Sequence, residues 1–169
     1  MPRRVDLGVT KIHWVQGDAG ITNVLAPTTA QLNAGTSVDI TCLLLSTYEV
    51  RADGSDTTNE RAVCETANVV AATVQNYMGN LILFRQFDDT TNLPESDDAL
   101  NIFTFGAVGW FVRRLGKSYS AAWAVGDNVD VYKFAVDTPQ IQGGTGEGYI
   151  KATIPLLQQG TFSTKSIVA

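Results

Sequence analysis

The last third of the chain alternates apolar and polar side chains over short stretches that are punctuated by glycine. Residues 109–116 read GWFVRRLG, and residues 124–139 read AVGDNVDVYKFAVDTP. Alternation with a period of two places successive side chains on opposite faces of a β-strand, and Gly-Asp pairs are typical of turns. The pattern therefore restricts this region to short strands joined by tight turns.

The same reasoning along the rest of the chain predicts a mainly β protein. Strands are expected over residues 11–15, 38–45, 61–74, 80–87, 108–115, 128–136 and 148–156. Pro155 would interrupt a central ladder, so the end of the last strand is expected at an edge or a bulge. The expected architecture is two packed β-sheets, forming a β-sandwich or flattened barrel, flanked by one α-helix.

Two segments have helical signals. Residues 27–34 are expected to form a short helix, with Pro27 early, Thr28 or Thr29 as the cap and Gly35 after its end. Residues 94–103 form the stronger candidate, because acidic side chains in its first turns complement the helix dipole and Ala99, Leu100 and Phe103 share one face.

The remaining polar segments are interpreted as connections. Residues 1–9 are expected to form an N-terminal arm and residues 160–169 a C-terminal arm, while residues 51–60 are expected to form a long acidic loop. A length of 169 residues fits one domain spanning residues 1–169.

Composition argues against several functional classes. Net charge is −5, whereas a general nucleic-acid binder needs clustered Lys and Arg. The sequence has no apolar run of membrane-spanning length and no secretion signal. Charged residues make up 17%, which predicts a polar surface that is easily desolvated in repeated protein contacts. Cys42 and Cys64 are expected to be free, buried thiols of a reducing cytoplasm.

No set of residues predicts catalysis, a cofactor or a metal. His13 is the only histidine, and nothing in the local sequence activates it or Cys64 as a thiol dyad. One histidine and two cysteines match no zinc spacing, and the acidic loop lacks the spacing of a calcium site. Residues 143–148 read GGTGEG, which lacks the Lys-Ser/Thr ending of a phosphate loop. Asp97 and Asp98 are the candidates for a pair of catalytic carboxylates that hydrolyses sugars. Adjacent residues on a helix point about 100° apart, however, and their place in the first turn already explains them.

Large aromatic and arginine side chains are the remaining candidates for function. Trp14, Trp110 and Trp123 are expected in the core first and at subunit interfaces second. Arg113 and Arg114 point to opposite faces of a strand, so one of them is expected to meet a neighbouring subunit. The interface candidates, including residues of the N-terminal arm and the acidic loop, are Arg3, Arg4, Trp14, Asp53, Asp56, Trp110, Arg113 and Arg114.

Three segments carry a resemblance to a known family: PTTAQLNAGTSVD at residues 27–39, GWFVRRLG and AVGDNVDVYKFAVDTP. Together they resemble the tail tube (major tail) protein of long, non-contractile-tailed bacteriophages. The resemblance implies a structural virion protein whose hexameric rings stack head to tail into a tube, with arms and a long loop locking successive rings. It also implies assembly in the host cytoplasm with tape measure, tail terminator and distal tail proteins.

The resemblance gives the negative net charge of the chain a role. DNA is expected to pass through the tube during ejection without specific binding, because an acidic wall repels phosphates. Residues 86–112 carry Asp88, Asp89, Glu95, Asp97 and Asp98 without a basic residue, and they are left unassigned between lumen and outer rim. Two alternatives stay open: the hexameric tube protein of bacterial type VI secretion, and a monomeric β-sandwich module that binds carbohydrate or acts in adhesion.

Overall fold

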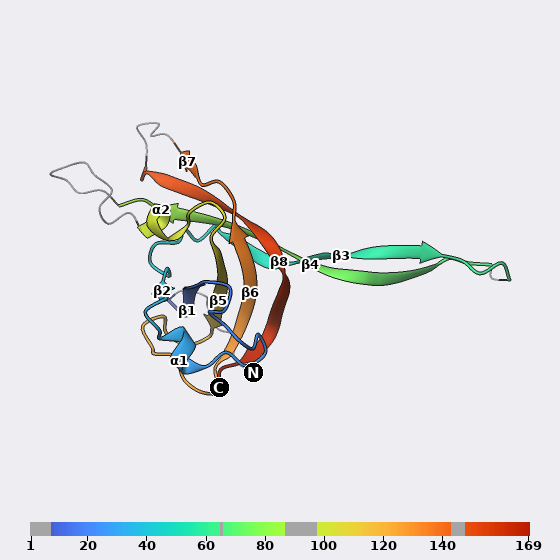
Figure 1. Ribbon diagram of the computed structural model, residues 1–169, viewed down its shortest axis with the longest axis horizontal. Coiled ribbons are helices and arrows are strands. Elements are labelled where there is room, and N and C mark those ends of the chain that lie inside the picture. The colour runs from blue at the N-terminus through green and yellow to red at the C-terminus, as the bar shows by residue number, and fades with distance from the viewer. Residues whose placement is uncertain (1–7, 65, 87–97, 143–147) are drawn as a thin grey trace.

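The computed structural model describes residues 8–64, 66–86, 98–142 and 148–169 (Figure 1). The predicted N-terminal arm and the first half of the predicted second helix lie largely outside these residues. The elements, in chain order, are β1 (Thr10–Gln16), α1 (Thr29–Leu32), β2 (Ser37–Asp39), β3 (Glu49–Glu60), β4 (Val69–Phe84), α2 (Asp98–Ile102), β5 (Val108–Leu115), β6 (Asn128–Val136), β7 (Gln140–Gln142) and β8 (Lys151–Ile167).

The mainly β class is confirmed, but the strands form one antiparallel sheet in place of two. Its order is β2-β1-β5-β6-β8-β4-β3, and β7 pairs with β8. The sheet stays continuous because β8 is long enough to change partners: residues 151–156 pair with β4, and residues 156–167 pair with β6. Pro155 lies at this change, between the residues that pair with β7 and those that pair with β6.

The sheet curves until its two sides meet. Beyond β2, Leu45 N donates a hydrogen bond to Ile82 O of β4 at 2.8 Å, and Phe84 N donates to Leu43 O at 2.8 Å. Leu44 and Leu83 form a β-bridge between them. The flattened barrel is therefore the observed one of the two predicted alternatives, and the segment after β2 closes it.

The inside of this barrel holds the larger hydrophobic core, which has many aromatic residues. Trp14 packs on Phe103 with ring centroids 4.9 Å apart, and Tyr77 packs on Phe134 at 5.1 Å. A smaller core covers the opposite face of β1, β5 and β6. It contains Val15, Leu32, Trp110, Val112, Trp123, Val131 and neighbouring apolar residues, so α1 and the loops near it shield the outer face of these strands.

The first helix forms as its cap residues predict. Thr28 is the N-cap: its Oγ1 accepts from Gln31 N at 3.2 Å, and Gln31 Oε1 accepts from Thr28 N at 3.0 Å. This reciprocal capping box satisfies two amides that would otherwise lack partners at the helix start. Leu32 at the end of α1 is buried in the smaller core.

Two predicted connections are strands. The expected loop at residues 51–60 lies in β3, which pairs with β4 from Glu49↔Asn80 to Glu60↔Val69. The expected C-terminal arm lies in β8, where Ser163 and Ser166 are buried, and Val168 just beyond β8 is buried too. Both segments are polar, so pairing with a neighbouring strand of the sheet decides their structure more than local hydrophobicity does.

Candidate assembly surface

The β3–β4 hairpin projects from the barrel and is the most prominent surface feature (Figure 1). From Arg51 to Gln75 every described residue of its two strands is exposed. Asp53 and Asp56, two interface candidates from the sequence, lie on this projection. Asn76 Nδ2 donates to Asp56 Oδ1 at 3.0 Å and to Gly54 O at 3.1 Å, which ties the two strands together at a bulge in β3.

The outer half of β4 is apolar, and sequence reasoning did not assign it to the surface. Val69, Val70 and Val74 are 58%, 62% and 53% exposed. Residues 67–76 read ANVVAATVQN and carry no charge. The sequence alone could have indicated an interaction site here, since an uncharged segment rich in valine is expected to be buried in a core or in a contact with another chain.

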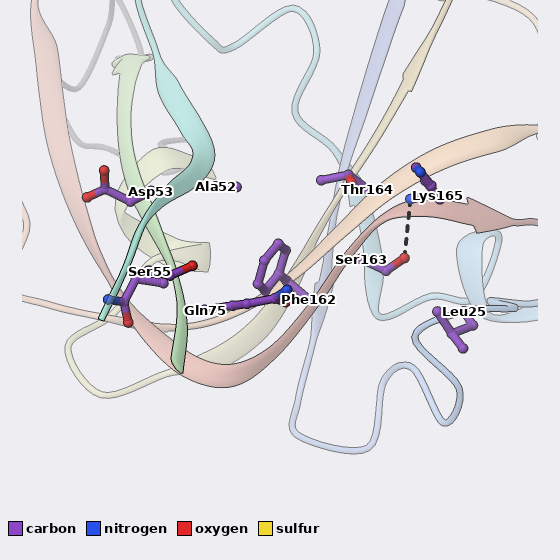
Figure 2. A pocket seen from close by; sticks show the side chains of 10 residues that line it. Leu25, Ala52, Asp53, Ser55, Gln75, Phe162, Ser163, Thr164 and Lys165 are labelled. Atoms are coloured by element: carbon purple, nitrogen blue, oxygen red, sulfur yellow. Dashed lines mark hydrogen bonds between the residues drawn. The ribbon is translucent and has the colours of Figure 1, made fainter. Parts of the chain in front are cut away.

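A crevice of about 500 Å³ lies at the root of the hairpin. Figure 2 shows its two sides: Asp53 and Ser55 of β3 on one, and Thr164 and Lys165 of β8 with Leu25 on the other. Phe162 and Gln75 lie between them, and Lys165 N donates to Ser163 Oγ at 3.2 Å. The crevice marks the place where β4 leaves the barrel and separates from β8.

Tyr77 fixes this point of separation. Its hydroxyl donates to Lys133 O at 2.5 Å and accepts from Gln159 N at 2.7 Å, so one buried side chain links β4, β6 and β8. Burial raises the pKa of the Tyr77 hydroxyl above its ordinary value of 10.0, although the backbone hydrogen bonds oppose that rise. The base of the hairpin is therefore held by the barrel, whereas its outer part is not.

Arg113 and Arg114 do point to opposite faces, but both find partners within the chain. Arg113 Nη2 donates to Asp130 Oδ2 at 2.7 Å across the β5–β6 pair. Arg114 is 1% exposed, and its Nη1 donates to Asp127 Oδ2 at 2.8 Å and to Ala122 O at 2.8 Å. Both side chains are therefore explained by partners within the chain. That one of them contacts a neighbouring subunit stays a prediction.

Asp127 is the centre of a buried charge cluster. Its Oδ2 also accepts from Ala124 N at 3.1 Å, and Lys117 Nζ contacts its Oδ1. Burial alone would raise the pKa of this carboxyl, but the hydrogen bonds from Lys117 and Arg114 lower the pKa below its ordinary value of 3.8. The AVGDNVD segment is thus a turn in which Gly126, at φ +87°, supplies the left-handed backbone and Asp127 supplies the anchor.

The tryptophans are internal. Trp14 and Trp110 are buried, with Trp110 Nε1 donating to Asp18 O at 3.1 Å, and Trp123 is buried beside the Arg114 guanidinium. Trp14 and Trp110 therefore drop out of the candidate interface. Arg3 and Arg4 lie outside the described residues.

His13 and the cysteines also have structural explanations. His13 Nδ1 lies 2.8 Å from Ser37 Oγ, and Nε2 lies 3.4 Å from Asp39 Oδ2. Burial would raise the pKa of the Asp39 carboxyl, but hydrogen bonds from His13 and Thr41 lower it well below its ordinary value. Cys42 and Cys64 are free and exposed, so their expected burial is wrong. Cys64 lies beyond the end of β3, near the end of the hairpin.

Neither a metal centre nor a membrane-spanning helix is found in the described part of the chain. No three or more His, Cys, Asp or Glu side chains there gather into a group able to hold a metal ion. Neither of the two helices has the length and apolar character needed to cross a membrane.

Comparison with known proteins agrees with this arrangement. The fold is similar to a chain in the cryo-EM structure of the anti-feeding prophage (AFP) baseplate, solved with sixfold symmetry imposed, with a TM-score of 0.55 and 13% identity over 96% of both chains. No curated protein matches the sequence. The family of phage tail tube proteins matches residues 1–169, the whole sequence. The chain therefore belongs to the phage tail tube protein family.

Proposed function

We propose that the chain is the subunit of a phage tail tube, forming hexameric rings that stack head to tail. The observation that carries the proposal is the family match over residues 1–169. The same match favours a phage tail over the tube of bacterial type VI secretion. The similar fold in a baseplate solved with sixfold symmetry imposed supports six copies per ring.

The projecting hairpin fits this function. An isolated two-stranded ribbon is marginally stable in water, and the part of the hairpin beyond the barrel contributes nothing to either core. Contact with another copy would bury its valines and order it. The hairpin therefore takes the place of the predicted loop that locks successive rings, with Asp53 and Asp56 as interface residues.

Assembly tests the proposal directly. Purified protein, concentrated and viewed by negative-stain electron microscopy, is expected to form rings and tubes whose end views show sixfold symmetry. Light scattering should report particles much larger than one chain of 18.2 kDa. A monomer that persists at every concentration and binds glycans would replace this proposal with the recognition module.

The tube is further proposed to conduct DNA without binding it and to have no catalytic role. Net charge of −5 supports the first point, since phosphate-binding surfaces are basic. Assembled tubes are expected to leave the mobility of double-stranded DNA unchanged in gel electrophoresis at low salt. Retention of DNA that weakens steeply as salt rises would contradict a passive conduit, because such dependence marks phosphate contacts. Tape measure, tail terminator and distal tail proteins are the proposed partners in the virion tail.

A further inference from the structure

The two edges of the projecting hairpin differ in how they are protected. β3 pairs with β4 along one edge, and β4 pairs with β8 only over Gly79–Phe84. Within the described residues, no strand pairs with the other edge of β4 over Val69–Gln75. Such an edge presents unpaired backbone N–H and C=O groups to any strand that approaches.

Charge separates the two edges further. The β3 strand carries Asp53, Asp56 and Glu60 along the projection, and charged side chains on an edge strand oppose pairing with other chains. The facing stretch of β4 reads VVAATVQ and carries neither a charge nor a proline. The hairpin is thus guarded along β3 and left open along β4, which singles out β4 as the edge that accepts a partner.

A second open edge lies on β8, inside the crevice. β8 pairs with β6 along one side as far as Ile167, but on the other side its pairing with β4 ends at Leu156. Gln159 N donates to Tyr77 Oη, the Thr161 backbone also interacts with that hydroxyl, and Ile167 N donates to Leu25 O at 3.1 Å. Between these points residues 160–164 read GTFST, again without charge, and among the described residues no strand pairs with this edge.

The two open edges cannot pair with each other inside one chain. β4 and β8 diverge from the point where their pairing ends, and Figure 1 shows the hairpin projecting away from the lower half of β8. At the root of the angle between them, a side-chain contact takes the place of strand pairing: Gln158 Nε2 donates to Asn76 Oδ1 at 3.2 Å. Each chain therefore carries one projecting edge and one receiving edge, which is the requirement for a head-to-tail contact between identical copies.

We propose that the outer half of β4 in one copy adds as a strand to the open edge of β8 in the next copy, at the crevice beside Phe162. This inference rests on the proposed tube function and names the contact that builds the tube. Pairing of this kind gives affinity through main-chain hydrogen bonds, and the valines supply apolar contact on both faces of the added strand. The sheet would then continue from one copy to the next.

Hydrogen exchange of monomer and assembled protein distinguishes this contact from others. On assembly, backbone amides in residues 69–75 and in residues 160–164 are expected to slow together, because both segments gain backbone hydrogen bonds. Amides of β3 over residues 57–60 that face away from β4 should keep exchanging at the monomer rate. Tubes in which residues 160–164 remain unprotected would contradict the inference while leaving the tube function intact. If the protein does not assemble at all, both this inference and the proposed tube function are wrong.

A pair of lysine variants provides a matched test. Val70 and Asn59 are cross-strand partners that share one face of the hairpin, and both are exposed. Val70→Lys places a charge on the open edge, and we expect the concentration needed for assembly to rise by about tenfold or more. Asn59→Lys adds the same charge to the guarded edge and should change the concentration needed for assembly by less than about twofold. Circular dichroism should show both variants folded. Equal effects of the two variants would indicate packing of the hairpin face in place of edge pairing.

Discussion

At the residue scale, Asp127 gives the clearest case of a side chain that the fold depends on. Its fully buried carboxylate accepts from the buried Arg114 guanidinium, so removing it leaves an unpaired buried cation. We expect Asp127→Ala to lower the free energy of unfolding by about 3–5 kcal/mol, measured by urea denaturation of the monomer. The pair Arg113 and Asp130 is partly exposed, so Asp130→Ala is the control and should cost clearly less.

The same carboxylate predicts a pH dependence with a definite sign. Because the pKa of Asp127 is lower in the folded chain than the ordinary 3.8, the stability it contributes is fully present above about pH 5. That contribution is lost as pH falls below about 4 and the carboxyl becomes protonated. Urea midpoints measured from pH 6 to pH 2 should fall less steeply for Asp127→Asn than for the natural chain. Identical slopes would show that other carboxylates control acid unfolding.

Gly109 is a second single-residue test, this time of packing. A Cβ built at this position would overlap Cζ2 and Cε2 of the Trp14 ring, which is buried in the barrel. Gly109→Ala should therefore destabilise the monomer by about 1–3 kcal/mol. Gly35→Ala is the matched control, because nothing lies within 4 Å of its Cβ position. Loss of stability in the control alone would contradict the role assigned to Trp14.

At the scale of elements, sequence periodicity predicted some strands to the residue and missed others altogether. β5 and β6 were predicted at their observed bounds, because both are rich in β-forming apolar residues and are bounded by glycine and Gly-Asp turn signals; both strands have buried residues on both faces. β3 and the second half of β8 were interpreted as loop and arm, because their residues are polar and mostly exposed. Their strand structure comes from pairing, of β3 with the next strand β4 and of β8 with β6, and the periodicity within one segment carries no record of its partner.

The candidate assembly surface was also predicted only in part from the sequence. Opposed directions for Arg113 and Arg114 followed from strand geometry, but their partners became visible only in the structure. Asp130 faces Arg113 in the register of β5 and β6, and Asp127 reaches Arg114 from the turn before β6. The open edge of β4 could not be predicted at all, since it depends on where pairing with β8 stops. What the sequence did contain was the uncharged run at residues 67–76.

Truncation tests the corrected structure of β8. Phe162 packs against Tyr77 and Tyr132 at ring-centroid distances of 4.9 and 5.6 Å, and Val168 is buried in the smaller core. Deletion of residues 160–169 is therefore expected to abolish cooperative unfolding, seen by circular dichroism and calorimetry. A removable arm would instead leave the melting transition unchanged.

Replacing the outer hairpin should have the opposite result. Asp53 and Asn76 are cross-strand partners, so residues 54–75 can be exchanged for an Asn-Gly turn that closes a two-residue hairpin. The variant removes more residues than the truncation of β8, yet the cores stay intact and the monomer should melt as a folded protein. Assembly into tubes should be lost, as judged by sedimentation and electron microscopy. Tubes formed by this variant would show that the projection is dispensable.

At the scale of the whole molecule, one chain with a projecting edge and a receiving edge behaves as a head-to-tail unit. The hairpin replacement removes the projecting edge together with Ser55 and Gln75, but it keeps the β8 side of the crevice at residues 162–165. This variant can therefore receive a neighbour on β8 but cannot reach the next one. Mixed with natural protein, it should end growth wherever it is incorporated. Tubes are therefore expected to shorten progressively as its mole fraction rises from about one in a hundred to one in ten, measured by electron microscopy at constant natural-chain concentration.

The control for this mixing experiment is the hairpin replacement carrying Thr164→Lys, which places a charge at an exposed position of the receiving crevice and leaves the core packing of Phe162 untouched. With neither edge available, this second variant should stay out of the tubes and leave their lengths unchanged. If both variants shorten tubes equally, the crevice is not the receiving site. If neither does, growth does not pass through the edge that the hairpin carries. Length shortened by the first variant alone requires that each chain joins its neighbour through two different edges. Such a contact is heterologous, the kind from which identical subunits build closed rings or open filaments.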